Sequence, residues 1–269
     1  MHRRISVNGV CFPKASLQED IAAWRALGAH TVGEHARKLR DAGWAQGIAA
    51  LQGSGLKIES IVHPSEFRLD RAHEWEKVRA DFCKTVDAAK AVGAVSVYTT
   101  SGNRGNMTWE EAADGFSAAM RPVLDYANAK GIRLLVEPTV ALHADKSIVH
   151  TLRDTVRLAE MSGLGICIDI FHCWTEAGLK ESVAAAVPRC NLVQVGDYVF
   201  GDKALPCRAV IGDGNIPLER IIGWILDEGY QGVFDLELNG PRIEREGNLA
   251  AVRRGIGQLE RILENLGVR

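Results

Sequence analysis

Four short apolar segments of the sequence each end in a side chain that can bind a metal ion. They cover residues 134–137, 166–169, 192–194 and 233–237, and they end in Glu137, Asp169, Gln194 and Glu237. A charge at the end of a buried strand costs several kcal/mol, on the order of 3–5, unless something pairs with it. Four such ends on successive strand candidates therefore predict one shared partner, a divalent cation.

The predicted ligands are all oxygen donors. Three carboxylates and one amide form a hard ligand set, which suits Mn²⁺ or Mg²⁺ better than an ion that prefers thiolates. We therefore expect one divalent metal ion. Mn²⁺ is the first choice, Mg²⁺ and Co²⁺ are alternatives, and Zn²⁺ is less favoured.

Further polar residues follow the same kind of segment. His172 lies three residues after Asp169 and is a candidate acid or base or substrate contact. Asp197 lies three residues after Gln194 and is a candidate for orienting a ligand or a substrate hydroxyl. An ordinary structural or surface role is the alternative for each. The candidates for binding substrate are His63, His143, Asp197 and Arg208, with Lys203 as a second basic residue in the loop of Arg208.

The elements that must position these residues alternate between strands and helices. Strand candidates cover residues 5–8, 30–34, 56–62, 94–98, 132–137, 165–169, 191–195 and 233–237. Ser16 and Thr108 each precede a glutamate by three residues, which is the spacing of a helix-capping box. Helical periodicity predicts one helix between Ser16 and Gly28 and a second that ends at Leu51. Further helices are predicted over about 74–92, 108–130, 147–161, 175–187, 217–228 and 247–266.

Eight strand–helix units in this length, without a linker, predict an α/β protein with one closed (β/α)₈ barrel domain over residues 1–269. The four strand ends would then lie on adjacent strands five to eight, at the face where such barrels carry their active sites. An open, doubly wound sheet is the main rival. It would need a glycine-rich turn after the first strand, and residues 10–13 contain none.

Composition limits the classes of function. The chain has 269 residues, 46% of them apolar, and a net charge of −2 without blocks of like charge. This gives no support for binding nucleic acid or an anionic membrane. The six cysteines form no CxxC pair and are expected to be reduced thiols. The start resembles no signal peptide, and no apolar run is long enough to span a membrane, so we expect a soluble cytoplasmic protein.

The order Glu137, Asp169-x-x-His172, Gln194-x-x-Asp197 and Glu237 resembles the xylose-isomerase-like TIM-barrel superfamily of sugar-phosphate isomerases and epimerases. The glycines of residues 212–214 and 229–232, which flank a helix before the last strand, strengthen the resemblance. Relatives include D-tagatose 3-epimerase, hydroxypyruvate isomerase and 3-dehydroshikimate dehydratase. The resemblance implies that Glu137 and Glu237 hold the metal and exchange a proton next to a carbonyl group. It also implies a small-molecule substrate and a dimer or tetramer.

Gln194 is a departure, because the family most often has histidine at that position. It resembles instead the metal set of bacterial and fungal 3-dehydroshikimate dehydratases. Two enzyme hypotheses follow from the resemblance. The first is a metal-dependent isomerase or epimerase of a hydroxy-carbonyl compound. The second is a dehydratase of a hydroxy-ketone with His172 as acid or base. A catalytically silent barrel that binds a ligand or a partner is the third hypothesis.

A nucleic-acid enzyme of the same superfamily, endonuclease IV, resembles the chain less well. Its zinc site needs further histidines, but the fourth strand candidate ends in Tyr98 and Thr99. The loops expected at the active face are also rich in aromatic residues. They either pack the loops together or line a pocket for a ring-bearing or partly apolar substrate. These residues are Trp109, Phe171, Trp174, Tyr198 and Phe200.

Overall fold

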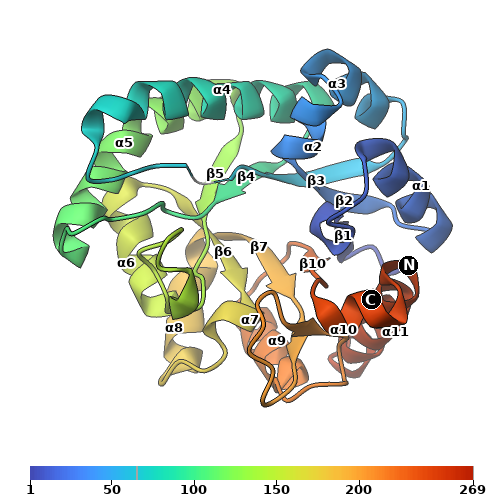
Figure 1. Cartoon of the computed structure of the whole chain (residues 1–269). Helices are drawn as coiled ribbons and strands as arrows, with labels where there is room; N and C mark the ends of the chain where they lie inside the picture. Colours follow the sequence, from blue (N-terminus) through green and yellow to red (C-terminus); the bar gives the residue numbers. More distant parts are fainter. Residues whose placement is uncertain (65, 269) are drawn as a thin grey trace.

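The protein is described by a computed structural model that covers residues 1–64 and 66–268. Eight parallel strands close into a barrel in the order β1-β10-β7-β6-β5-β4-β3-β2, and helices surround them (Figure 1). The predicted (β/α)₈ barrel is therefore confirmed. The barrel strands are β1 (Ile5–Asn8), β2 (Thr31–His35), β3 (Lys57–Val62), β4 (Ser96–Thr99), β5 (Arg133–Val136), β6 (Gly165–Asp169), β7 (Cys190–Val195) and β10 (Phe234–Leu236).

The outer helices follow the predicted alternation. Both predicted capping boxes are present, at Ser16 and at Thr108. The helices are α1 (Leu17–Leu27), α2 (Ala36–Asp41), α3 (Trp44–Gln52), α4 (Trp75–Val92), α5 (Trp109–Lys130), α6 (Leu152–Ser162), α7 (Ile170–Cys173), α8 (Leu179–Ala186), α9 (Leu218–Asp227), α10 (Pro241–Glu246) and α11 (Asn248–Asn265). Short 3₁₀ turns are η1 (Gly9–Cys11), η2 (Ala72–Glu74), η3 (Ala141–His143) and η4 (Val187–Arg189).

Several local features differ from the sequence prediction. The helix expected to reach Leu51 is two helices, α2 and α3, because Gly43 between them has a φ of 84°. The helix expected from residue 147 begins only after Thr151, whose side chain caps it. The loop after β7 contains a small antiparallel pair that was not predicted, β8 (Asp197–Tyr198) and β9 (Arg208–Ala209).

The interior of the barrel is filled by side chains rather than by solvent. Successive residues of a strand point to opposite faces, so an inward residue recurs every second position. Leu135, Cys167 and Leu192 form an interior layer with Tyr98 and Val233. Two residues further along β6 and β7, this alternation directs Asp169 and Gln194 inward above that layer.

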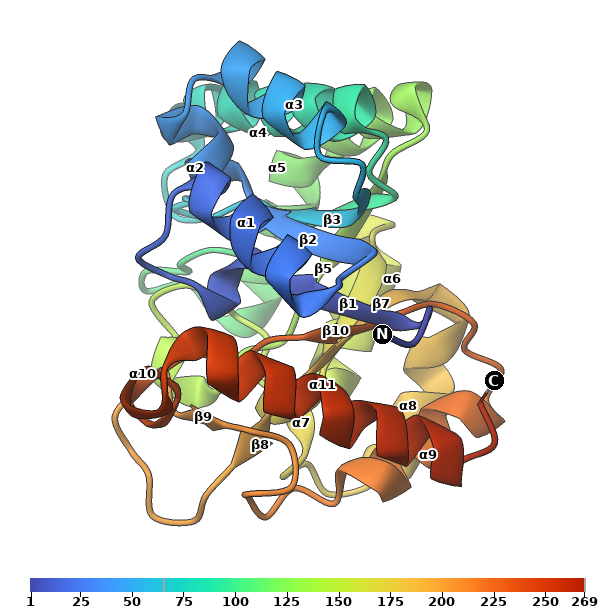
Figure 2. The same cartoon turned by 90° about the vertical axis from the view of Figure 1, so that its right-hand side faces the viewer.

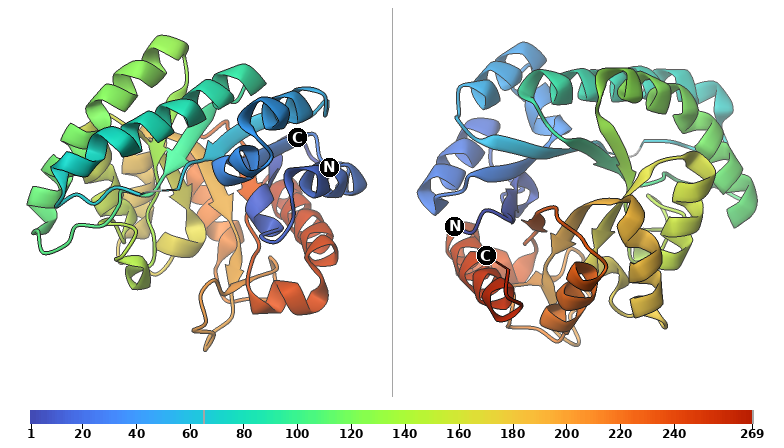
Figure 3. Two further views of the ribbon diagram at one scale, coloured as in Figure 1. Left: turned by 45° about the horizontal axis from the view of Figure 1, so that its top comes forward. Right: turned by 180° about the vertical axis from the view of Figure 1, so that it is seen from behind.

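The chain ends meet at the barrel wall. The backbone N–H of His2 donates a hydrogen bond of 2.8 Å to Glu260 of α11, and the two termini lie near each other beside α11 (Figure 3). Figure 2 shows that the loop between β8 and β9 projects at one end of the barrel. Within the described residues, no helix is long and apolar enough to cross a membrane.

Candidate active site

A buried cluster of polar side chains lies where β5, β6, β7 and β10 end. We call it the carboxylate chamber, and it consists of Glu137, Asp169, Gln194, Glu237 and Arg208. Register explains how the strands bring these residues together, because Asp169 is paired with Gln194 across β6 and β7. Gln194 is in turn paired with Asp235 on β10, two residues before Glu237. The sequence prediction placed four of the five chamber residues at the same face.

Arg208 is at the centre of the chamber. It reaches the chamber because β9 pairs antiparallel with β8, which turns the long loop back over the strand ends. Nη1 of its guanidinium group donates a hydrogen bond of 3.2 Å to Asp169 Oδ1, and Nη2 pairs with Asp169 Oδ2. Nη2 also donates to Glu237 Oε1 over 3.0 Å. The side chain is 3% exposed, so both ion pairs are shielded from water.

Gln194 connects the chamber to the barrel interior. Its Nε2 donates a hydrogen bond of 2.7 Å to Glu237 Oε2 and one of 3.0 Å to the hydroxyl group of Tyr98. The Tyr98 hydroxyl group also accepts a hydrogen bond of 3.0 Å from the side-chain amide of Asn8. The same amide donates a hydrogen bond of 2.7 Å to Asp235. This network beneath the carboxylates holds the Gln194 amide and the Glu237 carboxylate in one orientation.

The three carboxyl groups differ in acidity. Burial raises the pKa of Glu237 to about 7, against the opposing effect of Arg208. Burial and the charges of Glu237 and Asp169 raise the pKa of Glu137 well above its usual value. Burial by itself would raise the pKa of Asp169 too. The neighbouring Arg208 and His172 have the larger effect, and they lower this pKa below its usual value. Asp169 is therefore a fixed anion, whereas Glu137 and Glu237 can exchange protons.

A divalent cation fits the chamber in donor chemistry and in charge. Glu137 Oε2 is buried and, among the residues that the structure describes, meets no hydrogen-bond donor. When the three carboxylates are ionised, the charge of Arg208 balances only one of them. Uncompensated buried carboxylates with free oxygens are the donors that Mn²⁺ and Mg²⁺ prefer.

The ligands are not already arranged around an ion. In the described part of the chain, no three His, Cys, Asp or Glu side chains are grouped so that they could hold a metal. Arg208 provides the physical reason, because its guanidinium group occupies carboxylate oxygens of both Asp169 and Glu237. A bound cation and Arg208 would therefore compete for the same two carboxylates.

His172, a candidate acid, base or substrate contact, lies at the edge of the chamber. The side chain of Asp169 caps α7 by accepting a hydrogen bond of 2.9 Å from the backbone N–H of Phe171. This cap places His172 in the first turn of the helix. His172 Nε2 is 3.5 Å from Asp169 Oδ2, and His172 Nδ1 accepts a hydrogen bond of 3.2 Å from the backbone N–H of Val140. Burial lowers the pKa of His172 to about 4, so its ring is neutral at neutral pH.

His143 and His63 have different surroundings. The His143 ring is half-buried and packs edge-on at 6.4 Å from the His172 ring, which brings it near the site. His63, expected as a substrate contact, faces away from the chamber. Its Nδ1 is bonded to Thr85 of α4 at 2.8 Å, and its ring packs 4.1 Å from Phe82. His63 thus joins β3 to the outer helix.

Asp197, expected to orient a ligand or a substrate hydroxyl, is instead used by the backbone of its own loop. Its buried carboxylate accepts hydrogen bonds from four backbone N–H groups at 2.8–3.1 Å, those of Tyr198, Gly212, Gly214 and Ile216. A Cβ atom at Gly214 would collide with this carboxylate, which explains the glycine at that position. Asp197 therefore folds the long loop whose β9 strand carries Arg208.

We expect Asp197→Ala to destabilise the protein by at least about 3 kcal/mol, because it leaves several buried N–H groups without an acceptor. Urea unfolding followed by circular dichroism measures the loss. Asp213→Ala in the same loop is the control, because Asp213 is 45% exposed and pairs with Arg254 at the surface. It should cost less than about 1 kcal/mol. Equal unfolding midpoints for the two variants would contradict this role of Asp197.

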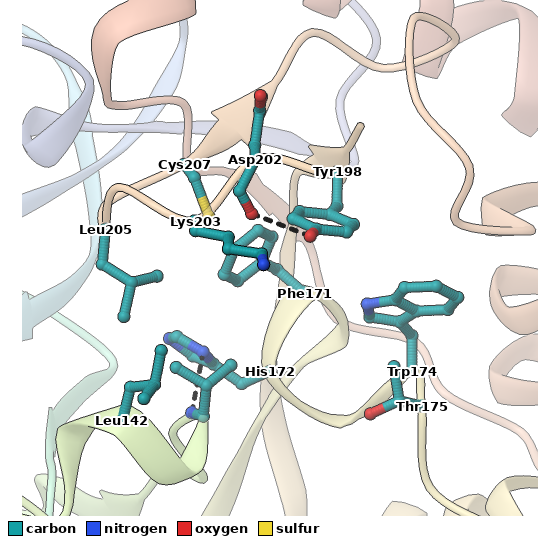
Figure 4. A pocket seen from close by; sticks show the side chains of 11 residues that line it. Leu142, Phe171, His172, Trp174, Thr175, Tyr198, Asp202, Lys203, Leu205 and Cys207 are labelled. Atoms are coloured by element: carbon teal, nitrogen blue, oxygen red, sulfur yellow. Dashed lines mark hydrogen bonds between the residues drawn. The ribbon is translucent and has the colours of Figure 1, made fainter. Parts of the chain in front are cut away.

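A cavity of about 410 Å³ opens beside the chamber between the loops that follow β5, β6 and β7 (Figure 4). We call it the aromatic pocket. His172 and Phe171 form its side toward the chamber, and Trp174, Tyr198, Leu142 and Leu205 form its other walls. Lys203 lines the same cavity from the loop between β8 and β9. The stacking of Arg208 on the ring of Phe171, 4.5 Å from its centroid, connects the pocket with the chamber.

The comparisons with known proteins identify the class of this chain. Residues 21–262 match the family model described as the xylose isomerase-like TIM barrel. The chain therefore belongs to the xylose isomerase-like TIM-barrel family, as the motifs of the sequence predicted. Among curated proteins, no sequence matches the chain.

Solved structures of low sequence identity share the fold. IolI protein with a bound zinc atom has 15% identity and a TM-score of 0.83, with 98% of this chain and 99% of that chain covered. L-ribulose 3-epimerase has 17% identity and a TM-score of 0.81, with 99% and 96% covered. The probable 3-DHS dehydratase AsbF of Bacillus anthracis has 14% identity and a TM-score of 0.75, with 94% and 98% covered.

Sequence reasoning missed the residues that support the chamber from below. Tyr98 and Asn8 were treated only as strand ends, and Asp235 was not singled out. A signal was nevertheless present, because Asp235 precedes Glu237 by two residues and must face the same side of β10. No sequence signal pairs Tyr98 with Gln194, since this contact depends on closure of the barrel.

Proposed function

We propose that the protein is an enzyme that moves a proton next to the carbonyl group of a small hydroxy-carbonyl compound, as an isomerase or epimerase. The observation that carries the proposal is the pair of buried glutamates, Glu137 and Glu237, whose raised pKa values suit proton exchange near neutral pH. Arg208, which is held between Asp169 and Glu237, supplies positive charge for the oxygen atoms of an enediolate. Family membership and the epimerase-like fold support the same class.

The residues that would hold a divalent cation, Mn²⁺ first, are Glu137, Asp169, Gln194 and Glu237. When bound, such an ion polarises a carbonyl group and stabilises an enediolate. The chain's own residues would do the rest. Glu137 and Glu237 take up and return the proton, Gln194 and Tyr98 orient Glu237, and the apolar interior layer beneath them keeps water from that side of the developing charge.

Dehydration of a hydroxy-ketone is the second candidate, and the position of His172 favours it. The neutral His172 ring lies between the chamber and the aromatic pocket, with Nε2 toward Asp169. A neutral ring at this place can donate a hydrogen bond to a departing β-hydroxyl group, and the proton that a glutamate has taken from the α-carbon can pass to that hydroxyl group so that it leaves as water. The fold shared with a probable dehydratase agrees with this candidate.

Proton exchange with solvent tests the proposal. The purified protein, with and without added Mn²⁺, is incubated in D₂O with hydroxyacetone, dihydroxyacetone, D-fructose and 2-hydroxyacetophenone, and mass spectrometry follows deuterium at the carbon next to the carbonyl group. We expect exchange faster than in buffer for at least one compound. A gain of mass without loss of water indicates the isomerase reaction, whereas a new enone absorbance indicates the dehydratase. Absence of both across the panel would contradict the proposed function.

A further inference from the structure

We propose that the aromatic pocket binds an apolar ring carried by the substrate, so that the enzyme acts on aryl- or cycloalkyl-substituted hydroxy-carbonyl compounds rather than on simple polyols. The inference rests on the proposed function and adds the substrate class to it. It starts from the character of the cavity walls beside the carboxylate chamber.

The walls offer few partners for hydroxyl groups. Leu142 and Leu205 lie on the opposite side of the cavity from Trp174 and Tyr198 (Figure 4), and Val140 and Phe171 also line it. A sugar chain in this space would lose hydrogen bonds with water and could recover only a few from Lys203 and Thr175, which costs free energy for each buried hydroxyl group left without a partner. A flat apolar ring would lose no such bonds and would pack against the aromatic faces.

The polar groups of the cavity are largely engaged elsewhere. Asp202 is paired with Arg242 outside the pocket, and the backbone carbonyl group of Asp202 accepts a hydrogen bond of 2.8 Å from the Tyr198 hydroxyl. Figure 4 shows this bond and the one that fixes His172 to the N–H of Val140. The surface that remains for a ligand is mainly hydrocarbon, and Lys203 and Thr175 are the polar side chains that line it beside the engaged ones.

The aromatic rings of the pocket form one continuous cluster with Phe200, which lies beside it. The centroid of Tyr198 lies 6.1 Å from Phe171 and 6.1 Å from Trp174, and Phe200 lies 6.0 Å from Trp174. Leu142 and Phe200 are 74% and 66% exposed, an unusual exposure for large apolar side chains. A bound ring in the pocket would contact Leu142 and remove its apolar surface from water.

The position of the pocket determines which part of a ligand enters it. Phe171 contacts Arg208 of the chamber on one side and lines the pocket on the other. His172 likewise lies between Asp169 and the pocket. A substrate whose reacting carbon lies at the glutamates can therefore place a ring attached to its carbonyl carbon between Leu142, Leu205 and Trp174. The cavity of about 410 Å³ has room for such a ring.

A matched pair of probes tests the inference. Hydroxyacetone and 2-hydroxyacetophenone share one hydroxy-carbonyl group and differ only in carrying a methyl or a phenyl group. Isothermal titration calorimetry on the full-length protein gives the dissociation constant of each. We expect the phenyl compound to bind at least about tenfold more tightly, a difference of about 1.4 kcal/mol.

Variants locate the preference in the pocket. Trp174→Ala should reduce the phenyl advantage by about fivefold or more, and Leu142→Asn should reduce it by about threefold. Leu142 is 74% exposed, so its replacement should leave the fold intact. Leu142→Asn therefore still tests the pocket if Trp174→Ala fails to fold. Leu249→Asn is the matched control, because Leu249 is exposed on α11 outside the pocket. It should keep the wild-type ratio.

Two outcomes would overturn the inference. The first is equal affinity for the two probes. The second is a phenyl preference that both pocket variants retain. Failure of the proposed function is a separate result, because it would show as absent deuterium exchange while the phenyl preference and its loss in the variants persisted. Exchange of hydroxyacetone without any phenyl preference would leave the function standing and remove the pocket inference.

Discussion

Replacement of Glu237 by glutamine is expected to lower kcat by about 10²–10⁴-fold, because an amide cannot accept the proton that the reaction moves. The change is nearly isosteric, so the fold should persist. Glu237 accepts hydrogen bonds from Gln194 and Arg208, and those bonds hold its carboxylate at the end of β10. Steady-state kinetics on the compound that exchanges deuterium most rapidly measures the effect, and the melting temperature reports on folding.

Glu59→Gln is the matched control for this experiment. Glu59 is also a nearly buried glutamate on a barrel strand, but it pairs with Lys57 on β3 rather than with the chamber. Its replacement should change kcat by less than about threefold, within the range of substitutions remote from the chemistry. If Glu237→Gln turned over at the wild-type rate, both the isomerase and the dehydratase candidates would be untenable.

Arg208→Met is expected to destabilise the metal-free protein by about 3–5 kcal/mol, because it leaves Asp169 and Glu237 as buried carboxyl groups without their cation. Methionine fills much of the volume and continues to pack on Phe171, so loss of charge dominates the effect. Thermal and urea unfolding in the presence of a chelator measure it. Substrate turnover should fall as well, since the positive charge beside the enediolate is lost.

Arg242→Met separates this effect from the loss of an ordinary arginine. Arg242 pairs with Asp202 and its side chain is 42% exposed, so its removal should cost less than about 1 kcal/mol. Equal stabilities of the two variants would contradict the role assigned to Arg208.

Added Mn²⁺ provides a second readout for Arg208. A ligand that binds only the folded protein stabilises it by RT ln(1 + [L]/Kd), so a tighter site gives a larger rise in melting temperature. If the cation and Arg208 compete for Asp169 and Glu237, Mn²⁺ should raise the melting temperature of Arg208→Met more than that of the wild type. A smaller rise in the variant would mean that Arg208 supports metal binding instead.

Much of the architecture follows from local sequence. The capping boxes at Ser16 and Thr108 and the glycines after helices mark helix ends through contacts within a few residues. Strand alternation likewise explains the inward direction of Glu137, which follows the interior residue Leu135 by two positions. The same rule accounts for His63. It follows Val62, which packs on the barrel interior, and therefore points outward to α4.

The active-site candidates from sequence had two different outcomes for a physical reason. Residues at strand ends, such as Asp169 and Gln194, are positioned by a regular backbone whose direction alternation predicts. Residues in the long loop after β7 are positioned by hydrogen bonds that no local rule specifies. Asp197 is taken up by four backbone N–H groups of that loop, and Arg208 is carried back over the strand ends by β9.

The sequence by itself determined the barrel, its family and the strand ends that carry the carboxylates. It did so because period-two alternation, capping and glycine positions act over short distances along the chain. Only the tertiary structure decided that Arg208 lies against Asp169 and Glu237 and that Tyr98 supports Gln194. These contacts join residues far apart in sequence, and they exist only after the barrel has closed and the loop has folded over it.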